Sequence, residues 1–115
     1  MQYALLIYQQ EAVAGLEPGS AALAAIVSRH MAFSKELGAK RIGGSGLKST
    51  SSATTVRTQG GARTVHDGPF AETREQLGGF YLIEAADLDE AIAIAGKVPL
   101  AGDGAIEIRP MLGAG

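Results

Sequence analysis

Two side chains in this sequence, His30 and Asp67, have the chemistry of an acid/base pair. At about 100° per residue, His30 falls inside the arc of about 120° that the apolar residues of its predicted helix occupy. Its ring should point toward the core, where it needs a partner, because an unpaired buried polar group costs about 1–3 kcal/mol. A carboxylate from Asp67 would orient the imidazole and raise its basicity, and a strand carbonyl could serve instead. A hydrogen-bonded core histidine without a chemical role is the alternative interpretation.

Asp67 begins the turn Asp67-Gly68-Pro69-Phe70, which has the features of a rigid mount for one carboxylate. A loop aspartate commonly accepts a hydrogen bond from the backbone N–H two residues on, but Pro69 has no N–H. The carboxylate must then bond the N–H of Phe70 or reach outward to a side chain or ligand. Pro69 fixes φ, Gly68 permits unusual backbone conformations, and we expect Phe70 to anchor the turn in apolar surface. A structural turn whose aspartate caps the next segment is the alternative.

Three neighbours of this turn are weaker candidates for lining a pocket: His66, Phe70 and Arg74. His66 alternates with Val65 at a strand end, and either faces solvent or is a second site histidine. Residues 72–75 are most simply a solvated connector, with Arg74 or Glu72 at a pocket mouth as the other interpretation. Imidazoles and carboxylates can bind a divalent metal, but no spacing such as His-x-x-x-His occurs, so we predict no metal and no cofactor.

Two glycine-rich stretches suggest nucleotide or RNA binding, but their neighbours argue against it. Residues 43–46 lack the Gly-Lys-Ser/Thr of a phosphate loop and no helix follows them, so we expect a flexible loop or a bulge. Phe80 and Tyr81 fall on opposite faces of a predicted strand, so at most one could stack on a base. Ten basic and twelve acidic residues alternate along the chain and give a net charge of −2. We therefore predict no nucleic-acid partner.

The composition is that of one soluble globular domain. The chain has 115 residues, of which 46% are apolar and 19% charged. It has no cysteine, which excludes disulfides, thiolate catalysis and Cys-based zinc sites, and fits a reducing compartment. The first strand starts at residue 2, which leaves no room for a signal segment, and no apolar run approaches the ~20 residues that span a bilayer. We expect a cytoplasmic protein.

Periodicity and capping signals predict the elements that position these side chains. Strands are expected where aromatic and branched residues alternate or run together, and helices where apolar residues recur every three or four positions. Ser20 can cap the first helix and Gly38 can end it, while Asp87 and Glu90 form a capping box for the second. We predict a strand at 2–8, a loop with Gly15, Pro18 and Gly19, and a helix at 20–37. A Gly-broken strand at 41–47, a polar loop at 49–52 and a hairpin of 53–58 and 62–66 around Gln59-Gly60-Gly61 should follow. The chain should end with a strand at 77–85, a helix from 87 closed by Pro99, and a strand at 105–110. The second helix should bury Leu88, Ala91, Ile92, Ala95 and Val98.

This element order fits two split βαβ halves that place both helices on one face of an antiparallel sheet. The other face is then uncovered. Because strands such as 2–8 are apolar on both sides, the uncovered face cannot remain in water, and exposed apolar patches beyond a few hundred Å² usually mark an interface. We expect this face to be an interface.

Residues 67–84, which start with Asp-Gly-Pro-Phe and run into an apolar strand, resemble the signature of the DGPF group within the YCII-related family. The resemblance extends over nearly the whole chain, from the strand at 1–8 through Ser28-Arg29-His30 to 105–110. It implies an α+β, ferredoxin-like βαββαβ-type fold with an extra hairpin, an antiparallel sheet with two helices on one face, and pairing into a dimeric α+β barrel. A homodimer through the open sheet face is therefore expected.

The resemblance also implies a site. The wider family has a histidine at this place on the first helix and pairs it with an aspartate as a proposed active-site dyad, and the matching positions here are His30 and Asp67. Relatives that share the dimeric barrel include isomerases, lyases and cofactor-free monooxygenases, so proton abstraction or elimination on a small molecule is the expected chemistry. The alternative is a non-catalytic ligand-binding or regulatory module, because genes of this group often lie beside those for extracytoplasmic-function sigma factors, which suggests a sigma factor as partner.

Overall fold

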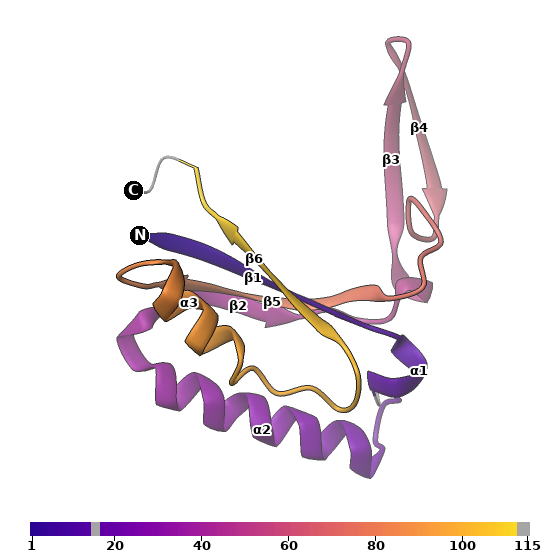
Figure 1. Ribbon diagram of the computed structural model, residues 1–115. Coiled ribbons are helices and arrows are strands. Elements are labelled where there is room, and N and C mark those ends of the chain that lie inside the picture. Colours follow the sequence, from indigo (N-terminus) through magenta and orange to yellow (C-terminus); the bar gives the residue numbers. More distant parts are fainter. Residues whose placement is uncertain (15–16, 113–115) are drawn as a thin grey trace.

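The fold is α+β, with a four-stranded antiparallel sheet and two helices on one of its faces (Figure 1). The computed structural model describes residues 1–14 and 17–112. The strand order is β2-β5-β1-β6, which is the ferredoxin-like arrangement that the element order predicts. The strands are β1 (Gln2–Gln9), β2 (Arg41–Gly46), β5 (Gln76–Glu84) and β6 (Ala105–Pro110), and the helices are α2 (Ala21–Leu37) and α3 (Leu88–Ala95). All lie within about two residues of the predicted bounds except the end of α3, which stops at Ala95, whereas the predicted helix runs on until Pro99 closes it.

A few local features depart from the predicted outline. A single turn of helix, α1 (Glu11–Ala14), follows β1 where only a loop is predicted. Gly15 of that loop lies outside the described residues. The predicted polar loop contains a short 3₁₀ turn, η2 (Thr50–Ser52), and another, η1 (Gly38–Lys40), joins α2 to β2. None of the helices in the described part of the chain is long and apolar enough to cross a membrane.

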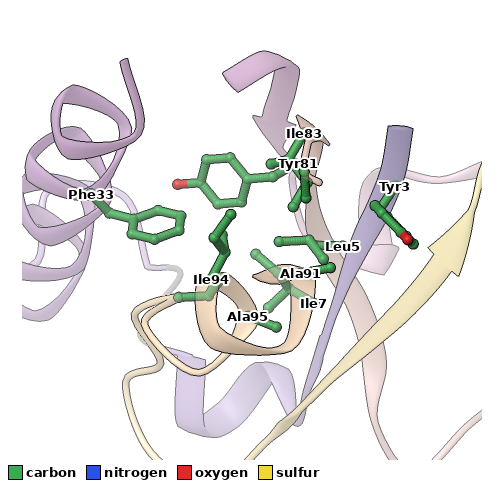
Figure 2. Packing of buried hydrophobic residues seen from close by; sticks show 11 residues of the cluster. Tyr3, Leu5, Ile7, Phe33, Tyr81, Ile83, Ala91, Ile94 and Ala95 are labelled. Atoms are coloured by element: carbon green, nitrogen blue, oxygen red, sulfur yellow. The ribbon is translucent and has the colours of Figure 1, made fainter. Parts of the chain in front are cut away.

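Strict alternation along β1 defines the two faces of the sheet. Tyr3, Leu5 and Ile7 are buried under the helices, while the residues between them are only partly buried. On β5, Tyr81 and Ile83 share the helix-covered face with them. Figure 2 shows these side chains packed with Phe33 of α2 and with residues of α3. The core therefore lies between the helices and one face of the sheet, and the opposite face is uncovered in a single chain.

The helix ends follow the capping signals. The Ser20 hydroxyl accepts a hydrogen bond from the N–H of Leu23, and Gly38 ends α2 with a φ of 55°, which favours glycine. At α3, the Asp87 carboxylate accepts from the N–H of Glu90 at 2.9 Å. The Glu90 carboxylate accepts in return from the N–H of Ala86 at 3.2 Å. The predicted capping box is therefore confirmed in its first bond and reaches one residue further back in its second.

The predicted buried stripe of α3 is wrong at two positions. Leu88 and Ile92 are 51% and 52% exposed, whereas Ile94 is 8% exposed. Ala91 and Ala95 are both buried, and their small side chains let the helix lie close to the sheet with its contact face centred on them. That rotation carries Ile94 inward and leaves Leu88 and Ile92 outside.

The hairpin of β3 (Thr54–Gln59) and β4 (Ala62–Asp67) forms a separate two-stranded sheet, called here the arm. Gly60 and Gly61 turn it with φ values of 59° and 80°, as the sequence predicts. Figure 1 shows the arm rising from the main sheet on the side away from α2 and α3. Almost all of its side chains are exposed.

The turn after the arm is held by hydrogen bonds rather than by Phe70. The N–H of Gly68 donates to the carbonyl of Ala53 at 2.7 Å, and the Thr55 hydroxyl donates to the carbonyl of Gly68 at 2.7 Å. Phe70 is 73% exposed, so the expectation that it anchors the turn in apolar surface is wrong for a single chain. The arm stands away from the core, and the turn at its base therefore meets no apolar surface.

Candidate ligand-binding site

A cavity of about 600 Å³ lies between α2 and the β2-β5-β1 part of the sheet. This volume is within the range of sites for small organic ligands. Its walls are mainly apolar, and they include Val27, Met31 and Leu47, whose side chains are 46%, 68% and 39% exposed. These exposed side chains place part of the wall at the surface, so a small molecule can reach the interior. Most polar lining groups form two sets. His30, Ser34 and Arg41 surround Tyr81 at one end, and Gln9 and Glu11 lie beside Gln76 at the other.

His30 and Tyr81 form the central pair of the cavity. The Nδ1 atom of His30 is 2.7 Å from the Tyr81 hydroxyl oxygen, and the two rings stack with centroids 5.8 Å apart. Among the described residues, Nε2 of His30 has no hydrogen-bond partner. If Nδ1–H donates to the tyrosine oxygen, Nε2 is a free base, and if the tyrosine donates to Nδ1, Nε2–H is a donor. Nε2 of His30 can therefore act as a base or as an acid, depending on which of the two residues donates the hydrogen bond between them.

Packing fixes the Tyr81 ring in place. Tyr81 is 5% exposed, and the Phe33 ring meets it edge-on with centroids 5.1 Å apart. Figure 2 shows the two rings pointing toward each other from β5 and α2, with the tyrosine hydroxyl on the α2 side. The alternation of β5 turns Tyr81 to the helix-covered face together with Ile83. β5 thus places the Tyr81 hydroxyl next to His30 of α2.

Burial shifts both members of the pair toward their neutral forms. Burial lowers the pKa of His30 below its ordinary value, and the nearby positive charge of Arg29 lowers it further. Burial also raises the pKa of Tyr81, and outweighs the opposite effects of the Ser34 hydroxyl and the Arg41 charge. At neutral pH the imidazole is unprotonated and the phenol is protonated, which is the state a histidine base requires.

Arg41 lies beside the pair at the start of β2. Its guanidinium carbon is 5.8 Å from the centroid of the Tyr81 ring, a cation–π distance. One terminal nitrogen donates to the carbonyl of Gly44 at 3.0 Å. The buried Nε atom has no partner, and no carboxylate of the described residues forms a salt bridge with this side chain. A largely unneutralised positive charge therefore lies in this end of the cavity wall.

The acidic group at the other end is already hydrogen-bonded. The Glu11 carboxylate accepts from the Ser49 hydroxyl at 2.7 Å and from the N–H of Thr50 at 2.8 Å. Burial acts to raise the pKa of Glu11, but the hydrogen bonds from Ser49 and Thr50 together lower it below its ordinary value. Gln76 in turn accepts from the N–H of Glu11 at 3.0 Å. Glu11 thus ties the loop after β2 to the end of β1.

The comparison with protein families matches residues 1–113 to the YCII-related domain. The chain belongs to the YCII-related family. An uncharacterized protein of Rhizobium meliloti (strain 1021) is 49% identical over 67 residues, which are 56% of this chain and 54% of that relative. The chain therefore matches about half the length of this curated relative, and the name of that relative assigns it no activity.

In this YCII-related chain, the structure brings His30 into the cavity but leaves Asp67 on the arm. Asp67 is exposed, pairs along the backbone with Thr54, and is not part of the cavity wall. His30 instead meets Tyr81, so His30 and Asp67 are not brought together within one chain. His66, Phe70 and Arg74 are exposed and also lie outside the cavity wall. The described residues contain no cluster of three or more His, Cys, Asp or Glu side chains suited to a metal.

The sequence does not identify Tyr81 and Arg41 as site residues, nor the polar lining residues Gln9, Glu11, Ser34 and Gln76. For Tyr81 a signal exists, because alternation along residues 77–85 puts it on one face with Ile83 and away from Phe80. If that face is the helix-covered one, Tyr81 meets the inward side of the first helix. Arg41 gives no comparable signal, since its position depends on the bulge that shifts the register between Arg41 and Gly43.

Proposed function

We propose that this protein binds a small organic molecule in the cavity between α2 and the sheet, and that His30 acts on it as an acid or base. The observation that supports this is the short contact between Nδ1 of His30 and the Tyr81 hydroxyl inside a cavity of ligand size. A histidine that served only the core would have no need of an adjoining cavity. Its lowered pKa suits a base at neutral pH.

Proton abstraction beside a carbonyl is the reaction class that this arrangement supports best. Nε2 of His30 would remove the proton, while Nδ1–H donates to the Tyr81 oxygen and holds the ring in place. Nε2–H would then return the proton at another atom of the substrate, which restores the neutral imidazole. Isomerisation consists of these two steps. In an elimination the first step is followed by departure of a leaving group, which takes up the proton from Nε2–H, and both reactions fit the lyase- or isomerase-like chemistry that the family resemblance suggests.

In this proposal Tyr81 takes the orienting role that the resemblance gives to Asp67. A carboxylate partner for His30 would have to come from Asp67 of a second copy, because the arm of the same chain points away from the helices (Figure 1). Because His30 meets Tyr81 and Asp67 lies on the arm, Asp67→Asn should leave the pKa of His30 unchanged in a single folded chain. A histidine NMR titration measures it, and a clear fall in that pKa would favour the His30–Asp67 dyad.

The proposed chemistry is tested by proton exchange in heavy water. Acetone, cyclohexanone, 2-oxobutyrate and γ-butyrolactone are incubated with the protein in D₂O, and proton NMR follows the loss of hydrogen beside the carbonyl. The wild type should exceed the buffer rate with at least one compound, and His30→Gln should lower the excess by about 10²–10⁴-fold. His66→Gln, on the arm, is the matched control and should keep the wild-type rate. An exchange rate that His30→Gln leaves intact contradicts the proposal.

A second candidate function, a regulatory or binding module, is favoured by the arm. Val56 and Val65 face each other across the hairpin and are 58% and 65% exposed, and Phe70 at its base is 73% exposed. Such apolar exposure suits a protein-docking surface. The sigma factor that the family resemblance suggests would be one partner. Retention of a purified extracytoplasmic-function sigma factor by the wild type, and its loss in Val56→Ser/Val65→Ser, would support this function over the enzyme.

A further inference from the structure

Arg41 supplies the evidence for the kind of molecule that the cavity takes. A guanidinium is always charged at physiological pH and carries five N–H donors. Arg41 uses one terminal nitrogen on a backbone carbonyl and places its cationic carbon near the Tyr81 ring. Its Nε is buried without a partner, and none of the salt bridges in the described residues involves it. A partly buried cation in this state gains most from an anion that arrives with the ligand.

Among the described residues, no other group of the cavity wall competes for Arg41. The one carboxylate that these residues place in the wall is that of Glu11, and it already accepts hydrogen bonds from Ser49 and Thr50. Glu11 bonds to Gln76, which precedes Tyr81 by five positions on β5, so the two ends lie roughly 15 Å apart along the strand. At that distance Glu11 cannot neutralise Arg41 by contact.

Between the two ends the wall is mainly apolar; its polar side chain there is Ser45, whose hydroxyl already donates to the carbonyl of Gly46 at 2.9 Å. The apolar side chains of this stretch are Leu23, Ile26 and Val27 of α2, Ile7 of β1, and Leu47 of the loop after β2. This stretch offers few groups that could hydrogen-bond a strongly polar ligand along its length. It instead offers burial to a hydrocarbon or aromatic body, at about 25 cal/mol for each Å² of apolar surface removed from water.

We infer that the cavity binds small organic acids, with the carboxylate at the Arg41 end and an apolar body lying between α2 and the sheet. This inference rests on the proposed function, because it assigns a ligand class to the same cavity. A carboxylate paired with Arg41 would bring the adjoining carbon toward His30 and Tyr81, since all three side chains line the same end. Acid recognition and proton transfer would then use neighbouring groups.

Matched pairs of acids and amides test the ligand class. Benzoate, phenylacetate and 2-naphthoate are compared with benzamide, phenylacetamide and 2-naphthamide by calorimetry and by protein NMR. Each acid should bind about tenfold more tightly than its amide, because a charge-assisted hydrogen bond replaces a neutral one. The shifted resonances should map to α2 and β5. Equal affinity within the pairs, no acid binding at millimolar concentration, or shifts confined to the open sheet face or the arm would overturn the inference.

Variants at Arg41 show whether this side chain is the source of the preference. Arg41→Gln should reduce the affinity for each acid to that of its amide, while Arg41→Lys should keep part of the preference because it keeps the charge. Arg63→Gln, an exposed arginine of the arm, is the matched control and should behave as the wild type. If Arg41→Gln retains the full preference, the inference is wrong.

Binding and proton exchange together distinguish an error in the ligand class from an error in the acid/base chemistry of His30. His30→Gln should retain the acid preference, because Arg41 is unchanged, even though it slows proton exchange. If acids and amides bind alike while exchange on cyclohexanone still depends on His30, only the ligand class is wrong. If acids bind at Arg41 but no carbonyl compound exchanges, the ligand class stands and the acid/base chemistry fails.

Discussion

The contact between His30 and Tyr81 joins packing and chemistry in one pair of residues. The tyrosine ring belongs to the core, where it meets Phe33, and its hydroxyl belongs to the cavity, where it meets the imidazole. A single side chain therefore couples fold stability to the orientation of the proposed base. The sequence predicts that His30 points inward. The sequence could not identify the hydrogen-bond partner of His30, because Asp67 and Tyr81 are both polar residues close to the predicted strand at 77–85. Only the direction of the arm excludes Asp67.

Substitutions at Tyr81 should separate the role of the ring from that of the hydroxyl. Tyr81→Phe keeps the ring against Phe33 and removes one hydrogen bond, so the free energy of unfolding should fall by only about 1 kcal/mol. Tyr81→Ala also removes the ring from the core and should cost about 3–5 kcal/mol. Urea denaturation measures both values. Similar losses for the two variants would show that the hydroxyl contact, not the ring packing, dominates at this position.

The lowered pKa of His30 predicts how stability depends on pH. In the unfolded chain the pKa of this histidine lies near its ordinary value of 6.5, whereas burial lowers the pKa in the folded chain. As the pH falls through about 6.5, the unfolded state takes up the proton first, so the free energy of unfolding decreases until the folded pKa is passed. Above that window the contribution is fully present. His30→Gln should remove this part of the dependence.

Denaturation at about pH 7.5 and about pH 5.5 gives the comparison. The loss of stability between the two conditions should be larger for the wild type than for His30→Gln. An equal loss in the wild type and in His30→Gln would show that burial of His30 does not penalise its charged form.

At the scale of elements, β2 positions Arg41 through its glycines. Gly44 has a φ of 145°, and a Cβ atom there would lie 2.6 Å from the carbonyl oxygen of Phe80. Gly46 on the same strand has nothing within 4 Å of its Cβ position. Because Arg41 donates to the carbonyl of Gly44, a shift at this position also disturbs the proposed anion site.

Gly44→Ala should therefore lower the free energy of unfolding by about 2 kcal/mol and weaken the binding of 2-naphthoate. Gly46→Ala is the matched control and should change both quantities little. Thermal denaturation and calorimetry measure the two effects. A Gly44→Ala protein as stable as Gly46→Ala would mean that β2 does not approach β5 as closely as the structure shows.

The elements themselves are largely predictable because their signals are local. Ser20, Gly38 and the pair Asp87 and Glu90 mark helix ends, and each makes or allows the bond that its residue type suggests. The burial of α3 is less predictable. The eight residues of α3 bear apolar side chains on more than one side of the helix. Burial of Ile94 rather than Ile92 depends on how closely Ala91 and Ala95 approach the sheet.

At the scale of the whole molecule, the sheet has one uncovered face. Leu6, Phe80 and Leu82 lie on it only partly buried, and Ile42 is 45% exposed. The arm rises on the same side (Figure 1). An isolated two-stranded hairpin is marginal in water, so both features favour a partner. We propose a homodimer through the open face, with the arm beside the second copy.

Analytical ultracentrifugation at micromolar concentration tests the dimer. The wild type should sediment as a dimer, and Leu82→Lys should yield a folded monomer because it adds a charge to the proposed interface without entering the core. Leu88→Lys makes the same change at an exposed position of α3 and should leave the dimer intact. A monomeric wild type would refute the interface and leave the open face in water.

The central claim, that His30 lies in a ligand-binding cavity, is tested most directly by imidazole NMR. The chain has two histidines, one in the cavity and one on the arm, so His66 is an internal reference. Addition of 2-naphthoate or 2-naphthamide should shift the ring resonances of His30 and leave those of His66 in place. If the two rings respond alike, or if neither responds at millimolar concentration, the cavity is not a binding site and the proposed function fails.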